Sequence, residues 1–171
     1  MKTYILLFRG INVGGKNILP MKELVSLLDK TGCKNVKTYI QSGNVVLRSP
    51  KIPGAGLSNA IESKFGFRSE VMVLEKSRLE TALKNNPYHS KEEKFVHFYF
   101  AGKDFKPDVE KLNRFSTNSE QYEIRGRVFY LHAPEGIGRS KLVANIDRCL
   151  GVPVTGRNLN TVNRLKELSD Q

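Results

Sequence analysis

The residues with the clearest chemical potential form the segment Arg9-Gly10-Ile11-Asn12-Val13-Gly14-Gly15-Lys16-Asn17, which follows an apolar run at residues 4–8. Successive glycine amides can hold an anion against bare backbone, and the two basic side chains would complement its charge. The alternative is a plain tight turn with the lysine in solvent. We predict ligand contacts at six positions of this segment: Arg9, Asn12, Gly14, Gly15, Lys16 and Asn17.

The same segment nearly matches the phosphate-binding P-loop, up to and including its lysine. A P-loop needs Ser or Thr after the lysine, and it runs directly into a helix. Here Asn17 takes the hydroxyl position, and Pro20 restricts Leu19 to extended backbone. The pattern therefore favours anion binding and argues against nucleotide hydrolysis.

A second polar segment, Gln41-Ser42-Gly43-Asn44, forms a turn between two short predicted strands. The topology described below brings this turn to the same end of a sheet as the first segment. We therefore predict that Gln41, Ser42 and Asn44 share one binding site with the glycine-rich loop.

Two segments of the second half have a similar composition, because glycines precede basic residues and a predicted helix in each. Helix N-termini attract anions, whereas a Ser or Asn at that place also serves as an ordinary cap. We include both segments among the candidate ligand contacts, as Arg139, Ser140 and Lys141 in one and Arg157, Asn158 and Asn160 in the other.

The sequence offers little for catalysis. It contains no paired acids, no His/Cys spacing typical of a metal site and no nucleophile elbow, so we expect no metal and no cofactor and assign no catalytic residue. His97 lies in an aromatic strand and is expected to be packed, and His132 is the better candidate for chemistry. Cys33 and Cys149 are expected to be buried bystanders.

The charge is strongly positive, with 28 Lys and Arg against 17 Asp and Glu. Residues 1–86 carry a net charge of +8 and residues 87–171 a net charge of +3, so most of the excess accompanies the glycine-rich loop. A basic surface favours anionic partners, although solvated surface lysines alone produce the same bias. No apolar run is long enough for a signal peptide or a membrane span, and we expect a cytoplasmic protein without a membrane partner.

The elements that position these residues follow one order twice. Strands are predicted at residues 4–8, 36–40, 45–48 and 71–74, with helices after the first and third, and residues 95–171 repeat this order. The second half includes one helix from about residue 139 to Leu150, with Arg139, Ser140 and Lys141 in its first turn. The pattern is the split βαβ of an α+β protein, with two tandem ferredoxin-like subdomains and antiparallel sheets of strand order 4-1-3-2. We place the subdomains at residues 1–86 and 95–171, joined by a linker at residues 87–94.

Four ordered motifs resemble the bacterial family called domain of unknown function 1697. They are the segments at residues 9–17, Thr38 to Val46, Gly136 to Lys141 and Gly156 to Val162. The resemblance implies two α/β-plait subdomains and no established activity. Leu159 departs from it, since an aromatic residue is expected there.

Two functional hypotheses remain. The first is binding of a phosphate-bearing or otherwise anionic ligand, either nucleic acid or a nucleotide-like small molecule, at the glycine-rich basic loops. The second is an enzyme that orients an anionic substrate between the subdomains with Arg9, Lys16, Asn44 and Arg157. The sequence does not specify an oligomeric state.

Overall fold

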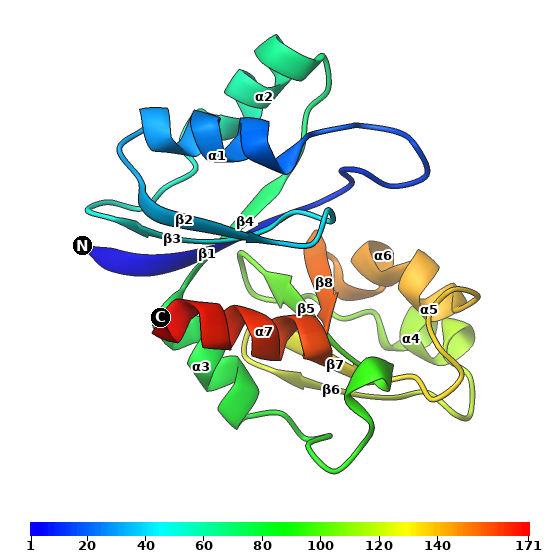
Figure 1. The fold of residues 1–171 in the computed structure, drawn as a ribbon. Helices are drawn as coiled ribbons and strands as arrows, with labels where there is room; N and C mark the ends of the chain where they lie inside the picture. The colour runs from blue at the N-terminus through cyan, green and yellow to red at the C-terminus, as the bar shows by residue number, and fades with distance from the viewer. The chain divides into compact units, whose positions relative to one another are not determined.

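The structure, a computed structural model, describes residues 1–171. Its elements in chain order are β1 (Lys2–Phe8), α1 (Met21–Lys30), β2 (Lys34–Tyr39), β3 (Asn44–Ser49), α2 (Leu57–Phe65), β4 (Val71–Glu75), α3 (Lys76–Lys84), η1 (Glu93–Phe95), β5 (Val96–Ala101), α4 (Val109–Phe115), β6 (Gln121–Arg125), β7 (Val128–His132), α5 (Lys141–Ala144), α6 (Ile146–Leu150), β8 (Val154–Asn158) and α7 (Leu159–Asp170) (Figure 1).

The strands form two antiparallel sheets with the same topology. The first has the order β2-β3-β1-β4 and the second β6-β7-β5-β8. Each is the predicted order 4-1-3-2 read from the other edge, so the α+β fold with two tandem ferredoxin-like subdomains is confirmed. The chain divides into two compact units, with unit 1 comprising Met1–Thr81 and Arg164–Gln171 and unit 2 comprising Ala82–Asn163.

In unit 1 the central strand β1 pairs with β3 and β4 on its two sides, and its residues from Tyr4 to Phe8 are buried. Helices α1 and α2 cover one face of the sheet (Figure 1). Leu24 and Leu28 of α1 enter that core at the spacing of one helical face. Ile11 and Leu19, at the two ends of the glycine-rich loop, are buried in the same core, so this loop is anchored on both sides.

In unit 2 helices α4, α5 and α6 cover one face of the sheet and contribute Leu112, Leu142 and Leu150 to its core. The single helix expected from about residue 139 to Leu150 begins at Lys141, after its N-cap Ser140, and is interrupted at Asn145, which has φ −115° and ψ 17°. The Asn145 side chain donates to the Lys141 carbonyl at 2.8 Å, the local competition with helical backbone that asparagine commonly makes. None of the helices is both long and apolar enough to cross a bilayer.

Candidate functional site

One side chain closes the loop between β1 and α1 and ties it to the β2–β3 turn. The Asn12 amide nitrogen donates to the carbonyls of Leu19 at 2.9 Å and Gln41 at 2.7 Å, while its oxygen accepts from the Leu19 backbone N–H at 2.8 Å. Asn12 has φ 53°, a left-handed conformation that asparagine tolerates better than most residues. The glycine-rich loop and the Gln41 turn therefore lie together, as the topology predicted.

The centre of the loop is a two-residue turn. The Lys16 N–H donates to the Val13 carbonyl at 3.0 Å, and Gly14 and Gly15 between them have φ 59° and 71°. Positive φ at both central positions is the requirement of a type I′ hairpin turn, which glycine meets without strain. A Cβ built on either glycine would meet no atom within 4 Å, so the turn projects outward, and Lys16 is exposed.

A second asparagine braces the loop from the other side. The Asn17 amide donates to the Gly10 carbonyl at 2.9 Å, and the backbone N–H of Asn12 donates to the Asn17 carbonyl at 3.0 Å. Asn17 thus occupies the position of the P-loop hydroxyl but serves the loop itself. Pro20 has ψ 134° just before α1, so extended backbone separates the glycines from the helix.

Hydrogen bonds of Asn44 and Phe8 hold the β2–β3 turn in place. Asn44 is fully buried, and its amide donates to the Tyr39 carbonyl and to the Ser42 hydroxyl, each at 3.1 Å. The Phe8 N–H donates to the Gly43 carbonyl at 2.9 Å. Of the three predicted contacts in this turn, Gln41 is exposed, Ser42 is half-buried and Asn44 supports the turn from within.

The third loop at this end of unit 1 precedes β4. The Arg9 N–H donates to the Glu70 carbonyl at 3.0 Å, and the Ser69 hydroxyl donates to the Arg9 carbonyl at 2.9 Å. The Arg68 guanidinium contacts Asn59 and Glu62 of α2 instead of the glycine-rich loop.

Sequence reasoning missed an apolar feature of these loops. Val13, Ile18 and Ile40 are 64%, 55% and 51% exposed. Each is next in the chain to Asn12 or to one of the two residues whose carbonyls accept from the Asn12 amide, so all three belong to the joined loops. We call residues 9–18 and 40–43 the loop tip. The only available sequence signal was aliphatic residues within otherwise polar, glycine-rich loops.

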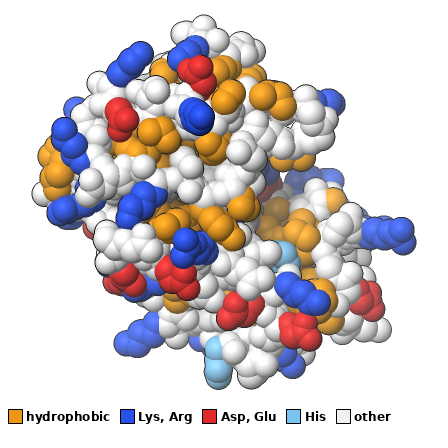
Figure 2. Space-filling view, viewed as in Figure 1, with side chains coloured by type: hydrophobic (Ala, Val, Ile, Leu, Met, Phe, Trp, Pro, Cys, Tyr) orange, Lys and Arg blue, Asp and Glu red, His pale blue; other side chains and the backbone are white.

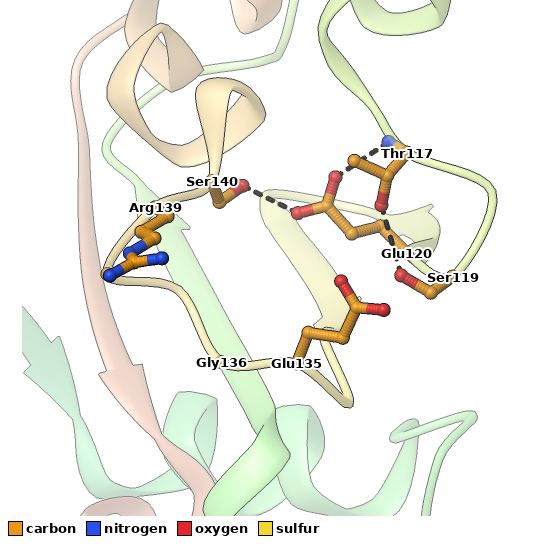
Figure 3. A pocket seen from close by; sticks show the side chains of 8 residues that line it. Thr117, Ser119, Glu120, Glu135, Gly136, Arg139 and Ser140 are labelled. Carbon is orange, nitrogen blue, oxygen red and sulfur yellow. Dashed lines mark hydrogen bonds between the residues drawn. The ribbon is translucent and has the colours of Figure 1, made fainter.

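In unit 2, Arg139 and Ser140 line an open pocket of about 450 Å³ with Thr117, Ser119, Glu120, Glu135, Gly136 and Gly138 (Figure 3). Glu120 accepts from the Thr117 N–H at 2.8 Å and from the Ser140 hydroxyl at 2.5 Å. Figure 3 shows the Glu120 and Glu135 carboxylates on one side of the pocket and Arg139 on the other. An anion here would therefore meet two negative groups that sequence reasoning had not placed nearby.

The hydroxyl of Ser140 also accepts from the Val143 N–H at 3.2 Å, which makes Ser140 the N-cap of α5. Lys141 follows it and is exposed. The first of the two groups of basic loop residues in unit 2 thus includes a residue already used for capping.

The remaining predicted contacts lie around β8. The Asn158 side chain accepts from the Thr161 N–H at 3.0 Å and so caps the start of α7, while Asn160 is exposed. Arg157 donates to the Gly156 carbonyl at 2.8 Å, and burial lowers the pKa of its guanidinium to about 10.

Two four-stranded sheets of this order define a tandem α/β-plait protein. The chain belongs to the family described as "Protein of unknown function (DUF1697)", whose sequence profile matches residues 1–130. It is similar to a solved structure, that of conserved bacterial protein SP0830 from Streptococcus pneumoniae, with 26% identity and a TM-score of 0.67 over 98% of each chain. Comparison with curated proteins gave no match. These similarities identify the family and the fold of the chain, and neither of them implies an activity.

The role of Asn12 leads to a prediction about stability. Asn12→Ala removes three hydrogen bonds and should lower the free energy of unfolding in urea by about 3 kcal/mol. Asn17→Ala is the matched control, because Asn17 has a similar φ of 52° but loses only one side-chain bond, so we expect a loss of about 1 kcal/mol. Equal losses in the two variants would show that the Asn12 amide does not join the loops.

Proposed function

We propose that the loop tip of unit 1 binds a phosphate-bearing ligand. The observation that carries the proposal is the combination of positive charge with a preorganised backbone. The tip contains Arg9 and Lys16 and no Asp or Glu, and the Asn12 amide joins its two loops. A site whose groups are already held in place loses less conformational entropy when a ligand binds.

The unit 2 pocket is the weaker site for an anion. Glu120 and Glu135 oppose Arg139 there, and Ser140 is engaged with Glu120 and with the helix end. The exposed turn at Gly14 and Gly15 has no such opposing charge within its own loop.

The proposal has two versions, in which the phosphate-bearing ligand is either nucleic acid or a nucleotide-like small molecule. On the face shown in Figure 2, Lys and Arg side chains are spread over the surface and interspersed with acidic ones, so this face has no continuous basic stripe for a long polymer. The contact is therefore proposed as local to the tip.

Substitution of Lys16 tests the proposal. Lys16→Ala should weaken binding of a phosphate-bearing ligand about fivefold at low salt, since a single lysine at a phosphate surface contributes about 1 kcal/mol. Lys51→Ala is the matched control, because Lys51 is exposed and lies past Ser49, at the opposite end of β3 from the turn. Fluorescence anisotropy would measure binding to a labelled oligonucleotide, calorimetry would measure binding to ATP, and sedimentation would measure binding to anionic vesicles.

The salt dependence provides a second readout. Binding should weaken steeply as salt rises. In the Lys16→Ala variant the slope of log K against log salt concentration should be smaller by about one, as expected when a phosphate contact is lost. Absence of binding to all three ligands at low salt, or equal effects of the Lys16 and Lys51 substitutions, would contradict the proposal.

A further inference from the structure

The loop tip carries three aliphatic side chains that the fold does not use. Val13, Ile18 and Ile40 remain more than half exposed, although Ile11 and Leu19 in the same loop are completely buried. The single Asn12 amide holds the carbonyls of Leu19 and Gln41, the neighbours of Ile18 and Ile40 in the chain. The three residues therefore lie in the two loops that Asn12 joins, and Val13 pairs with Lys16 across the turn.

Ile40 is also strained. Its φ is 52°, a left-handed conformation that is an outlier for a β-branched residue. Glycine or asparagine would occupy this turn position at lower cost. Because the side chain is exposed, burial does not offset the strain. Strained residues of this kind cluster at binding and switch sites, which makes Ile40 a candidate contact residue.

The shape and chemistry of the tip indicate the kind of partner. Sites for small molecules are concave, whereas the turn at Gly14 and Gly15 projects with no atom within 4 Å of a built Cβ. Single-stranded nucleic acid stacks its bases on aromatic rings, but the exposed large hydrophobic residues of the chain include no aromatic one. A lipid bilayer instead accepts aliphatic side chains at its acyl boundary and cations at its phosphates.

We infer that the phosphate-bearing partner of the loop tip is the surface of an anionic phospholipid bilayer. Val13, Ile18 and Ile40 enter the boundary of the acyl chains, and Lys16 lies among the headgroup phosphates. This inference rests on the proposed function and names its ligand. The sequence-based expectation of no membrane partner depended on the lack of a spanning run, and binding at the interface needs no such run.

The test uses the full chain and vesicles of equal parts phosphatidylglycerol and phosphatidylcholine, compared with pure phosphatidylcholine. The chain should sediment with the anionic vesicles only. Ile40→Asn should weaken this binding about fivefold, the effect of losing about 1 kcal/mol of apolar contact. The same variant should melt about 2 °C higher, because asparagine relieves the left-handed strain. Loss of binding together with higher stability excludes unfolding as the cause.

Ile52→Asn is the matched control. Ile52 is 66% exposed in unit 1, and it follows β3 at the end opposite to the turn, so the same chemical change should leave vesicle binding unaltered. The inference is overturned if Ile40→Asn binds vesicles as tightly as the wild type, or if an oligonucleotide or ATP binds in a Lys16-dependent way while vesicles do not. In that second case the proposed function stands. Absence of binding to every one of these ligands overturns both.

Discussion

Gly43→Ala should lower the free energy of unfolding by about 3 kcal/mol, the combined cost of overpacking and of a left-handed alanine. Gly43 has φ 88°, and a Cβ at this position would lie 2.7 Å from both Ile11 Cδ1 and Phe8 Cβ. The isoleucine terminus can rotate away, but Phe8 Cβ is fixed by the central strand. The β2–β3 turn must therefore lift from the sheet, which would also separate Gln41 from Asn12.

Gly15→Ala measures the conformational part of this effect without the steric part. Gly15 has φ 71°, close to that of Gly43, but a Cβ there would meet nothing within 4 Å. We expect a loss of about 1 kcal/mol from conformational strain alone. Urea unfolding of the two variants measures the difference. If both alanine variants lost the same stability, the close contact of Gly43 with Phe8 and Ile11 would be wrong.

The second large effect is a loss of stability in acid through His97. This side chain is 7% exposed, and burial lowers its pKa to about 4. In the unfolded chain a histidine takes up its proton near pH 6.5. Between these values the unfolded state binds the additional proton, so the free energy of unfolding should fall as the pH is lowered from 6.5 to 4 and then level off. The pKa difference corresponds to about 3 kcal/mol.

Comparison with His97→Gln separates this effect from the titration of carboxylates. The wild type should lose about 3 kcal/mol more than the variant between pH 7 and pH 4, because glutamine takes up no proton in this range. Chemical denaturation of both proteins at several pH values provides the measurement. Parallel curves of unfolding free energy against pH would show that His97 takes up its proton as readily in the folded state as in the unfolded state.

Much of the fold follows from local patterns in the sequence. The apolar run at residues 4–8 predicted a strand, and the Gln41–Asn44 turn predicted a hairpin. Together with the repeated element order, these features were enough to predict two antiparallel sheets of order 4-1-3-2. The topology then predicted that the glycine-rich loop and the Gln41 turn meet, and the Asn12 hydrogen bond to the Gln41 carbonyl confirms that they do.

Other features depend on contacts between distant residues and could not be read from spacing. Asn12 and Asn44 were predicted as ligand contacts, but their amides also hold the two loops in shape. Glu120 reaches Ser140 across 20 positions of the chain, so the acidity of that pocket had no local signature. The break at Asn145 accompanies a side-chain bond to the Lys141 carbonyl, which periodicity does not reveal.

The structure also changes the interpretation of the glycine-rich loop. Its glycines are explained by an exposed type I′ turn, and Asn17 closes that loop instead of holding a metal. What remains unexplained by folding is an acid-free tip with Lys16 and three exposed aliphatic side chains. The proposed function and the inference about its ligand depend on these residues.

Membrane binding by the loop tip is tested most directly by a map of the backbone amide resonances of the full chain during titration with anionic bicelles. We expect the largest changes at Val13 to Ile18 and Ile40 to Gly43, while residues 50–54 at the far end of β3 stay unchanged. Combining Lys16→Ala with Ile40→Asn should raise the bicelle concentration at the midpoint of these changes about 25-fold. Changes centred on any other surface, or no changes in the loop tip at saturating bicelle concentration, would contradict it.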